Sequence, residues 1–316
     1  MLNEFYGNEI CCGSYACLNA IKDEQISSKM FELSTSVPFG VKHIEDGTFD
    51  RLLTTYCDPN IGIDKAIPLW GYEQRKKEFS DKNEVLDYLK EELMLRPVVL
   101  GPLDMGYLNY LPAAHLYRRM DHYILLEGTW NGKVRCIDSE GIFGYQMAYK
   151  ELLSYLNVEK LLEASGKICV RSFRKKVDFD IMEVLRKTLQ YAWENMREAE
   201  NMGQGSEAYQ ACFRYLADQN INLWKLPLLY DVNYLIQRKL LFLKLLEEWN
   251  AMVTGSRHVF MENSRLIRKQ QSIFIDIFGR LKWKDRIEVD DFKRVAEEEK
   301  NIMICLEACK TYMTNA

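Results

Sequence analysis

The sequence is poor in the residues and motifs that build metal and nucleotide sites. Its 316 residues include only four histidines, which lie far apart. Cys11, Cys12 and Cys17 have no second cysteine pair at the spacing of zinc ligands. Neither a Walker A motif nor a dinucleotide-binding fingerprint occurs. We therefore expect no structural metal and no bound cofactor.

Targeting and membrane signals are also missing. Residues 1–4 read Met-Leu-Asn-Glu, which is neither the basic start nor the apolar stretch of a secretion signal. The longest leucine-rich run, 235–246, is interrupted by Arg238, Lys239 and Lys244. A net charge of −4 gives no bulk attraction to nucleic acid or to anionic membranes. We expect a cytoplasmic protein that binds neither nucleic acid nor membrane.

What is present is typical of a globular protein with reduced thiols. Hydrophobic residues make up 47% of the chain and charged residues 28%, and the length allows one to three domains. The nine cysteines are odd in number and spread over the chain, which without a secretion signal argues against a disulfide framework.

The character of the sequence changes near residue 176. We predict an α+β domain over 1–176 and an all-helical unit over 177–316. Five segments of the second unit carry apolar residues at helical spacing: 181–197, 207–217, 235–249, 264–278 and 290–311.

The first unit alternates helices with short apolar strands. The pattern predicts helices over 12–29 and 49–57, and a third helix that begins after Asp81 and ends at Arg96-Pro97. It also predicts strands over 98–100, 122–127, 133–138 and 168–173. The long loop 101–112 follows the first of these strands, and Asp104 and Tyr107 within it are candidate substrate-binding residues. The alternative is a surface loop packed by its own tyrosines.

The most informative stretch is 8–21, which contains a cysteine, a glycine and the start of an apolar helix. A Cys12 thiol at a helix N-terminus lies at the positive end of the helix dipole, which favours the nucleophilic thiolate. The alternative is a buried, unreactive cysteine pair.

His122 opens one predicted strand and Asp138 ends the next. A two-residue turn at Asn131-Gly132 would make their side chains face opposite ways, because side chains alternate along a strand. A three-residue turn would place them diagonally on one face. We therefore expect the longer turn if His122 and Asp138 are to pair.

Cys12, His122 and Asp138 together supply the nucleophile, base and orienting group of acyl transfer through a thiol. The backbone N–H of Cys12 would face the oxyanion. Three other histidines are rivals for the base: His43, His115 and His258.

Several short motifs resemble the papain-like fold in its bacteriocin-leader-peptidase branch. They are most similar to the N-terminal domain family named after the butirosin-biosynthesis acyltransferase. The similarity covers roughly 5–175 and lies in 12–14, 101–104, 121–128 and 137–138. The helical remainder resembles the unit that often follows that domain.

This resemblance implies transfer of an acyl group from a phosphopantetheinyl carrier protein to a small amine in natural-product biosynthesis, as in amide synthases of the closthioamide type. It maps the nucleophile to Cys12, since that cysteine precedes Gly13. The family's glutamine, six residues before the cysteine, is Tyr6 here, so Tyr6 and Asn8 are candidates for the second oxyanion donor. A leader-cleaving cysteine peptidase and a non-catalytic binding protein are the alternatives, and the oligomeric state stays open.

Overall fold

The chain forms two compact units. The computed structural model describes residues 11–45, 50–53, 57–112, 114–158, 161, 164, 166–218, 225–252, 257–283 and 288–314. One unit combines Met1–Thr35 with Asp58–Asp180, and the other combines Ser36–Cys57 with Ile181–Ala316. The second unit therefore takes 36–57 from within the segment that the sequence assigns to the first domain.

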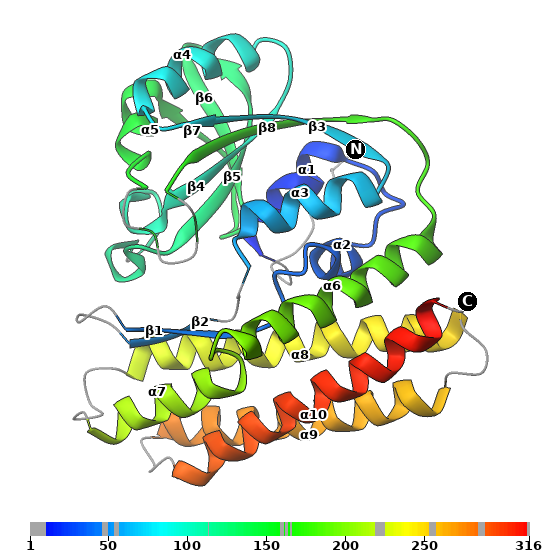
Figure 1. Ribbon diagram of the computed structural model, residues 1–316. Coiled ribbons are helices and arrows are strands. Elements are labelled where there is room, and N and C mark those ends of the chain that lie inside the picture. Colours follow the sequence, from blue (N-terminus) through cyan, green and yellow to red (C-terminus); the bar gives the residue numbers. More distant parts are fainter. Residues whose placement is uncertain are drawn as a thin grey trace. The chain divides into compact units, whose positions relative to one another are not determined.

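The first unit is built on a six-stranded, fully antiparallel sheet (Figure 1), which makes its class α+β. The strand order is β3-β8-β4-β5-β6-β7. Their bounds are β3 Tyr72–Phe79, β4 Val98–Asp104, β5 Asp121–Trp130, β6 Lys133–Asp138, β7 Ile142–Ala148 and β8 Ile168–Lys175.

Helices cover both faces of this sheet. Their bounds are α1 Cys12–Ile21, α2 Ser28–Ser34, α3 Pro59–Leu69, α4 Lys82–Glu92 and α5 Tyr149–Tyr155, with single turns η1 Met105–Tyr107 and η2 Ala114–Tyr117. Helix α1 packs on β5 and its neighbours, and α3 packs on β3. Residues of α4 and α5 share a buried core with the alternate residues Leu100, Ile124 and Leu126 of β4 and β5. The arrangement places the start of α1 against the central strands.

Two predicted helices differ from the structure. The helix expected over 12–29 is two helices, because Lys22 adopts a left-handed backbone conformation with φ 56° that ends α1. The helix expected over 49–57 is wrong, since β2 (Asp50–Leu53) pairs there with β1 (Lys42–Glu45). Tertiary pairing overrides the local pattern at that point.

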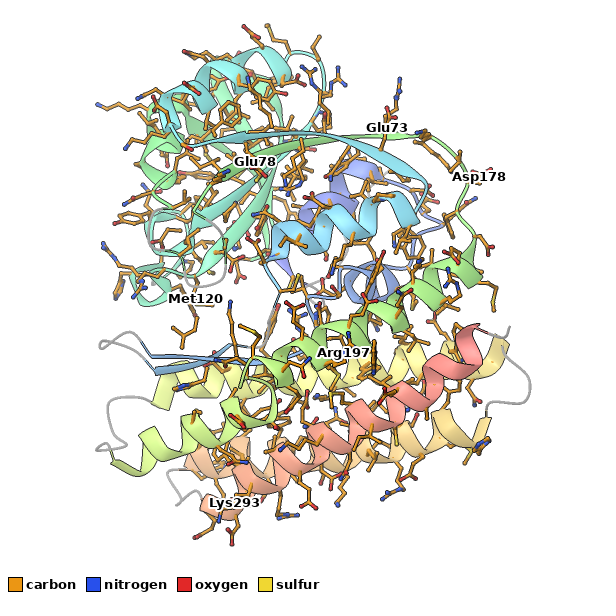
Figure 2. The ribbon with its side chains drawn as sticks, in the orientation of Figure 1. Glu73, Glu78, Met120, Asp178, Arg197 and Lys293 are labelled. Atoms are coloured by element: carbon orange, nitrogen blue, oxygen red, sulfur yellow. The ribbon has the colours of Figure 1, made fainter. Side chains whose placement is uncertain are left out.

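Strand β3 has no counterpart in the predictions, because its sequence is dominated by charge. It lies at the edge of the sheet and pairs with β8 alone. Glu73 and Glu78, labelled in Figure 2, lie on this strand and form ion pairs with Arg174 and Lys76. Charged side chains protect an edge strand from pairing with other chains.

The second unit contains five long helices and a short pair of strands. The helices are α6 Ile181–Asn201, α7 Ser206–Asp218, α8 Lys225–Met252, α9 Arg257–Trp283 and α10 Val289–Thr314. Each contains one of the five predicted helical segments. The described part of 177–316 contains helices alone, and β1 and β2, which come from earlier in the chain, pack on α7 and α8. No helix in the described parts of the chain is both long and apolar enough to cross a membrane.

A bulge in β4 lies beside the expected active site. Leu100 pairs with Ile124 and Leu103 with His122, so Gly101 and Pro102 together face the single residue Tyr123. The Tyr123 ring lies so close to Gly101 that a Cβ there would be 2.4 Å from ring atom Cδ1 and 2.8 Å from the backbone oxygen of His122. No side chain fits at position 101 without moving β5.

We expect Gly101→Ala to destabilise the protein by about 1–3 kcal/mol, the usual cost of overpacking. Denaturant unfolding of the purified variant measures this. Gly279→Ala is the matched control, because a Cβ on that α9 residue would meet nothing within 4 Å. A Gly101→Ala protein as stable as wild type would show that β5 can move aside.

Candidate active site

The β5–β6 hairpin brings His122 and Asp138 to one face of the sheet through a β-bulge, which the sequence does not predict. Trp130 pairs with Lys133, so the turn is the two-residue Asn131-Gly132 type, with φ 51° and 72°. The expected three-residue turn is therefore wrong. The register shifts instead between Leu126 and Gly128, where Glu127 is an extra residue on β5. This bulge supplies the one-residue shift that the pairing needs.

His122 and Asp138 are in direct contact and buried. The Nε2 atom of His122 lies 2.9 Å from both carboxylate oxygens of Asp138, and the two residues are 2% and 0% exposed. Burial acts to lower the pKa of His122, but the charge and hydrogen bond of Asp138 raise it above its ordinary value. Burial acts to raise the pKa of Asp138, and the contact with His122 holds it below its ordinary value.

This contact fixes the tautomer of the imidazole. An ionised carboxylate only accepts hydrogen bonds, so Nε2 of His122 carries the proton that it donates to Asp138. In the neutral ring, Nδ1 is then the basic nitrogen. A base with this orientation is ready to accept a proton at Nδ1.

Two further groups hold the Asp138 carboxylate. The Tyr110 hydroxyl donates to Oδ2 at 2.7 Å, and the backbone N–H of Glu140 donates to Oδ1 at 2.9 Å. Both hydrogen bonds favour the ionised carboxylate and contribute to its lowered pKa. Tyr110 lies in the tyrosine-rich loop that the sequence singled out, although its role was not predicted.

We expect Tyr110→Phe to reduce His122-dependent activity several-fold, since it removes one hydrogen bond of roughly 1 kcal/mol or more to a charged group. Steady-state kinetics would measure it. Tyr145→Phe is the control, because the Tyr145 ring packs on Tyr110 while its hydroxyl donates to Glu151. Equal losses in both variants would assign the effect to packing.

Cys12 begins α1 next to the same strand. The residue as a whole is half-buried, and its sulfur interacts with the backbone N–H of Tyr123, the residue after His122. The carboxylate of Asp138 lies within electrostatic range of the thiol. The structure thus places the sulfur beside the backbone of the residue that follows His122.

Most of the surroundings of the Cys12 thiol disfavour its ionised form. Burial, the charge of Asp121 and that of Cys11 raise the pKa of Cys12, and the N–H of Tyr123 only partly offsets them. A reaction of this thiol therefore needs a base to remove its proton.

The first turn of α1 offers backbone donors beside the sulfur. The side chain of Cys11 makes no capping hydrogen bond to this turn. The first backbone bond within the helix runs from Tyr15 N–H to Cys11 O, so the amides of residues 12–14 have no acceptor within the helix. These donors are suited to a developing oxyanion.

The other predicted residues have different surroundings. Asp104 caps η1 through hydrogen bonds from the N–H groups of Gly106 and Arg119, at 2.9 and 3.0 Å, and burial raises its pKa. The ring of Tyr107 lies under the guanidinium of Arg118. Tyr6 and Asn8 lie outside the described residues. A substrate-binding role for these four stays a prediction.

The rival histidines lie on other elements of the fold. His115 is exposed in η2, whereas His43 lies in β1 and His258 in α9, both in the second unit. His122 is the histidine that contacts Asp138. Within the described residues no group of three or more His, Cys, Asp or Glu could hold a metal ion.

Sequence comparison adds little to this geometry. No family model matches the chain. The chain is similar to an uncharacterized protein, YobF, of Bacillus subtilis strain 168, with 27% identity over 201 residues. The match covers 63% of this chain and 64% of YobF, less than two thirds of the relative's length. Its name states no activity, so the argument for function rests on the site.

Proposed function

We propose that this protein is a cysteine-dependent acyltransferase with a papain-like catalytic domain. In this proposal it moves an acyl group from a carrier-protein thioester, through an acyl-Cys12 intermediate, to a small amine in natural-product biosynthesis. The observation that carries the proposal is the His122–Asp138 contact at 2.9 Å beside a helix that begins at Cys12. The sequence resemblance supplies the reaction class and the carrier protein.

The first half-reaction forms the acyl-enzyme. His122 Nδ1 removes the Cys12 proton while the sulfur attacks the thioester carbonyl, and the amides of residues 12–14 stabilise the oxyanion. The intermediate collapses by breaking the carbon–sulfur bond to the carrier. The departing thiolate takes the proton from His122, which leaves a free carrier thiol and acyl-Cys12.

In the second half-reaction the amine attacks acyl-Cys12. His122 takes a proton from the attacking nitrogen, the carbon–sulfur bond to Cys12 breaks, and the Cys12 sulfur recovers a proton from His122. The product is an amide. No ATP is required, because thioester exchange is nearly balanced and amide formation from a thioester is favourable.

The test is to incubate the protein with an acyl N-acetylcysteamine thioester and a primary amine, and to identify products by mass spectrometry. Amide together with a transient acyl adduct on the protein supports the proposal. Acid in place of amide would favour a hydrolase or leader-type peptidase. Neither adduct nor product would favour a non-catalytic binding protein.

A further inference from the structure

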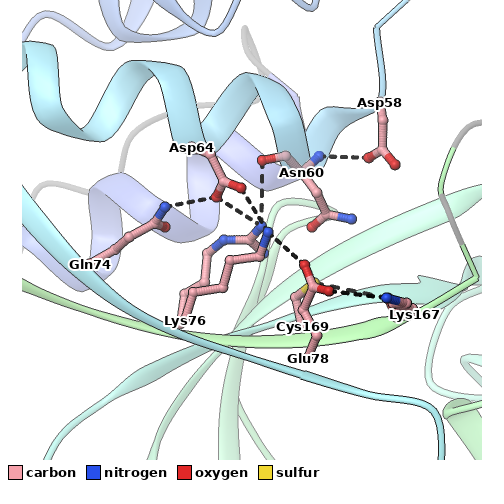
Figure 3. A network of polar contacts seen from close by, with 9 residues as sticks. Asp58, Asn60, Asp64, Gln74, Lys76, Glu78, Lys167 and Cys169 are labelled. Atoms are coloured by element: carbon pink, nitrogen blue, oxygen red, sulfur yellow. Dashed lines mark hydrogen bonds and ion pairs between the residues drawn. The ribbon is translucent and has the colours of Figure 1, made fainter.

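A second group of polar side chains is buried in the first unit, around Arg171 of β8. Arg171 is fully buried. Its Nη2 donates to Asp64 Oδ1 at 3.3 Å and to the backbone oxygen of Asn60 at 3.4 Å. Figure 3 shows Asp64 on α3 also accepting from Gln74 and Lys76. Arg171 thus shares its one carboxylate partner with two other donors.

Several atoms around Arg171 have no hydrogen-bond partner among the described residues. Nε and Nη1 of Arg171 are unpartnered, and so are both side-chain polar atoms of Asn60, at the start of α3, and the hydroxyl of Tyr123, on β5. Asn60 is 4% exposed and Tyr123 1%. These three residues come from three elements, and Arg171 is linked to both of the others: it bonds Asn60, and its charge acts on the Tyr123 hydroxyl.

So many unpaired buried groups in one place require an occupant. A buried polar atom without a partner is costly, and most such atoms in native proteins bond to protein or ordered water. The unpartnered atoms are three nitrogens and two oxygens, so the occupant must both accept and donate hydrogen bonds. Lys76, the other cation on Asp64, also pairs with Glu78, so these two carboxylates balance Arg171 and Lys76, which favours a neutral occupant over an anion. Water meets both requirements.

Tyr123 links this group to the candidate active site. A Cβ built on Gly13 or on Gly101 would lie 3.5 or 2.4 Å from its ring, so the ring lies between α1 and β4. Its backbone N–H interacts with the Cys12 sulfur, while its hydroxyl belongs to the Arg171 group. The same residue therefore links the Arg171 group to the Cys12 sulfur.

We propose that Arg171, Asn60 and Tyr123 enclose a buried site for ordered water, and that this water anchors Tyr123 where its N–H meets Cys12. Arg171 and Asn60 then act as positioning residues through Tyr123. The positioning role rests on the proposed nucleophile Cys12, whereas the water site does not.

Tyr123→Phe tests both parts, because it removes the hydroxyl and keeps the ring and the N–H. If water bonds the hydroxyl, the variant loses a hydrogen bond and its melting temperature falls by about 2–4 °C. If the hydroxyl is unsatisfied, removing it relieves a cost and the melting temperature stays or rises. The sign of the shift therefore decides whether the site is hydrated.

The second readout is the pH dependence of Cys12 alkylation by iodoacetamide, followed by peptide mass mapping without substrate. We expect the Cys12 titration in Tyr123→Phe to move to higher pH, since the thiolate loses a well-placed donor. Tyr209→Phe is the matched control: it removes a buried hydroxyl from α7 in the second unit and should leave the titration unchanged. An unchanged titration in Tyr123→Phe would overturn the anchoring role.

A crystal structure of the wild-type protein gives an independent reading should Tyr123→Phe fail to fold. Water within hydrogen-bond distance of both Arg171 Nη1 and Tyr123 Oη supports the proposal, and a dry, closed contact overturns it. None of these measurements requires acyl transfer. Failure of the proposed acyltransferase function would therefore leave the water site unaffected. Conversely, absence of the water would leave the acyl-transfer experiment as it stands.

Discussion

Cys12→Ala is expected to eliminate the covalent acyl adduct and to reduce amide formation by at least about 10³-fold. The intermediate is a bond between the acyl carbon and the Cys12 sulfur, and alanine offers no atom that can form it. Intact-protein mass spectrometry measures the adduct after mixing with an acyl thioester, and chromatography with mass detection measures the amide. The small side chain should leave the fold of α1 unchanged.

Cys11→Ala is the matched control for this experiment. Cys11 precedes the helix and is also partly exposed, but its side chain does not cap α1. We expect this variant to keep the adduct and most of the activity. An adduct that survives in Cys12→Ala and disappears in Cys11→Ala would reassign the nucleophile.

Asp138→Asn is expected to lower activity by roughly 10²–10⁴-fold, as replacement of the orienting carboxylate does in other triads. The amide group of asparagine can place a donor against His122 Nε2, which would favour the opposite tautomer and remove the base from Nδ1. Steady-state kinetics of the amide-forming reaction would measure the loss.

The pH profile of Asp138→Asn provides a second readout. Asp138 raises the pKa of His122 above its ordinary value in the wild-type protein, against the effect of burial. Without the carboxylate, burial prevails, and we expect the limb of the activity profile that reports His122 to move to lower pH. Asp87→Asn, an exposed substitution in α4, is the control and should change neither rate nor profile. An unchanged profile in Asp138→Asn would contradict the pairing argument.

Stability should change with pH in the same variant. Because folding lowers the pKa of Asp138, the carboxylate stabilises the wild-type protein above its unfolded pKa of about 3.9, and this stabilisation disappears as pH falls through the folded value. Folding raises the pKa of His122, so its contribution is present below about 6.5 and is lost as pH rises through the folded value. Asp138→Asn removes the first dependence and reverses the second, because burial alone then lowers the pKa of His122, and denaturant unfolding across pH would detect both changes.

The hairpin illustrates how far sequence reasoning reaches. Asn131-Gly132 identifies the turn, and the apolar alternation identifies both strands. The same reasoning fails on the register, because the bulge at Glu127 depends on how β5 meets its neighbours on both edges. The longer turn that this reasoning requires for the pairing of His122 with Asp138 is wrong, because the bulge at Glu127 supplies the same one-residue shift.

In the second unit, likewise, the sequence predicts the helices but not the strands. Five amphipathic segments predict α6 to α10, because a helix that buries one face repeats apolar residues with its own period. The strands β1 and β2 are not predicted, since each has only four residues. They pair with each other and belong to the same unit as 181–316, which is distant in the sequence. Short strands carry too little periodicity to be separated from a helical turn.

Local patterns in the sequence predict the long helices, the Asn-Gly turn and the start of a helix at Cys12, because each of these signals lies within a short stretch of chain. Which of these elements meet depends on the tertiary fold. The contact between His122 and Asp138, the support from Tyr110, the raised pKa of the Cys12 thiol and the unpaired polar atoms around Arg171 all depend on burial and on neighbours distant in the chain. Burial and electrostatics act through space, and a linear pattern does not contain those distances.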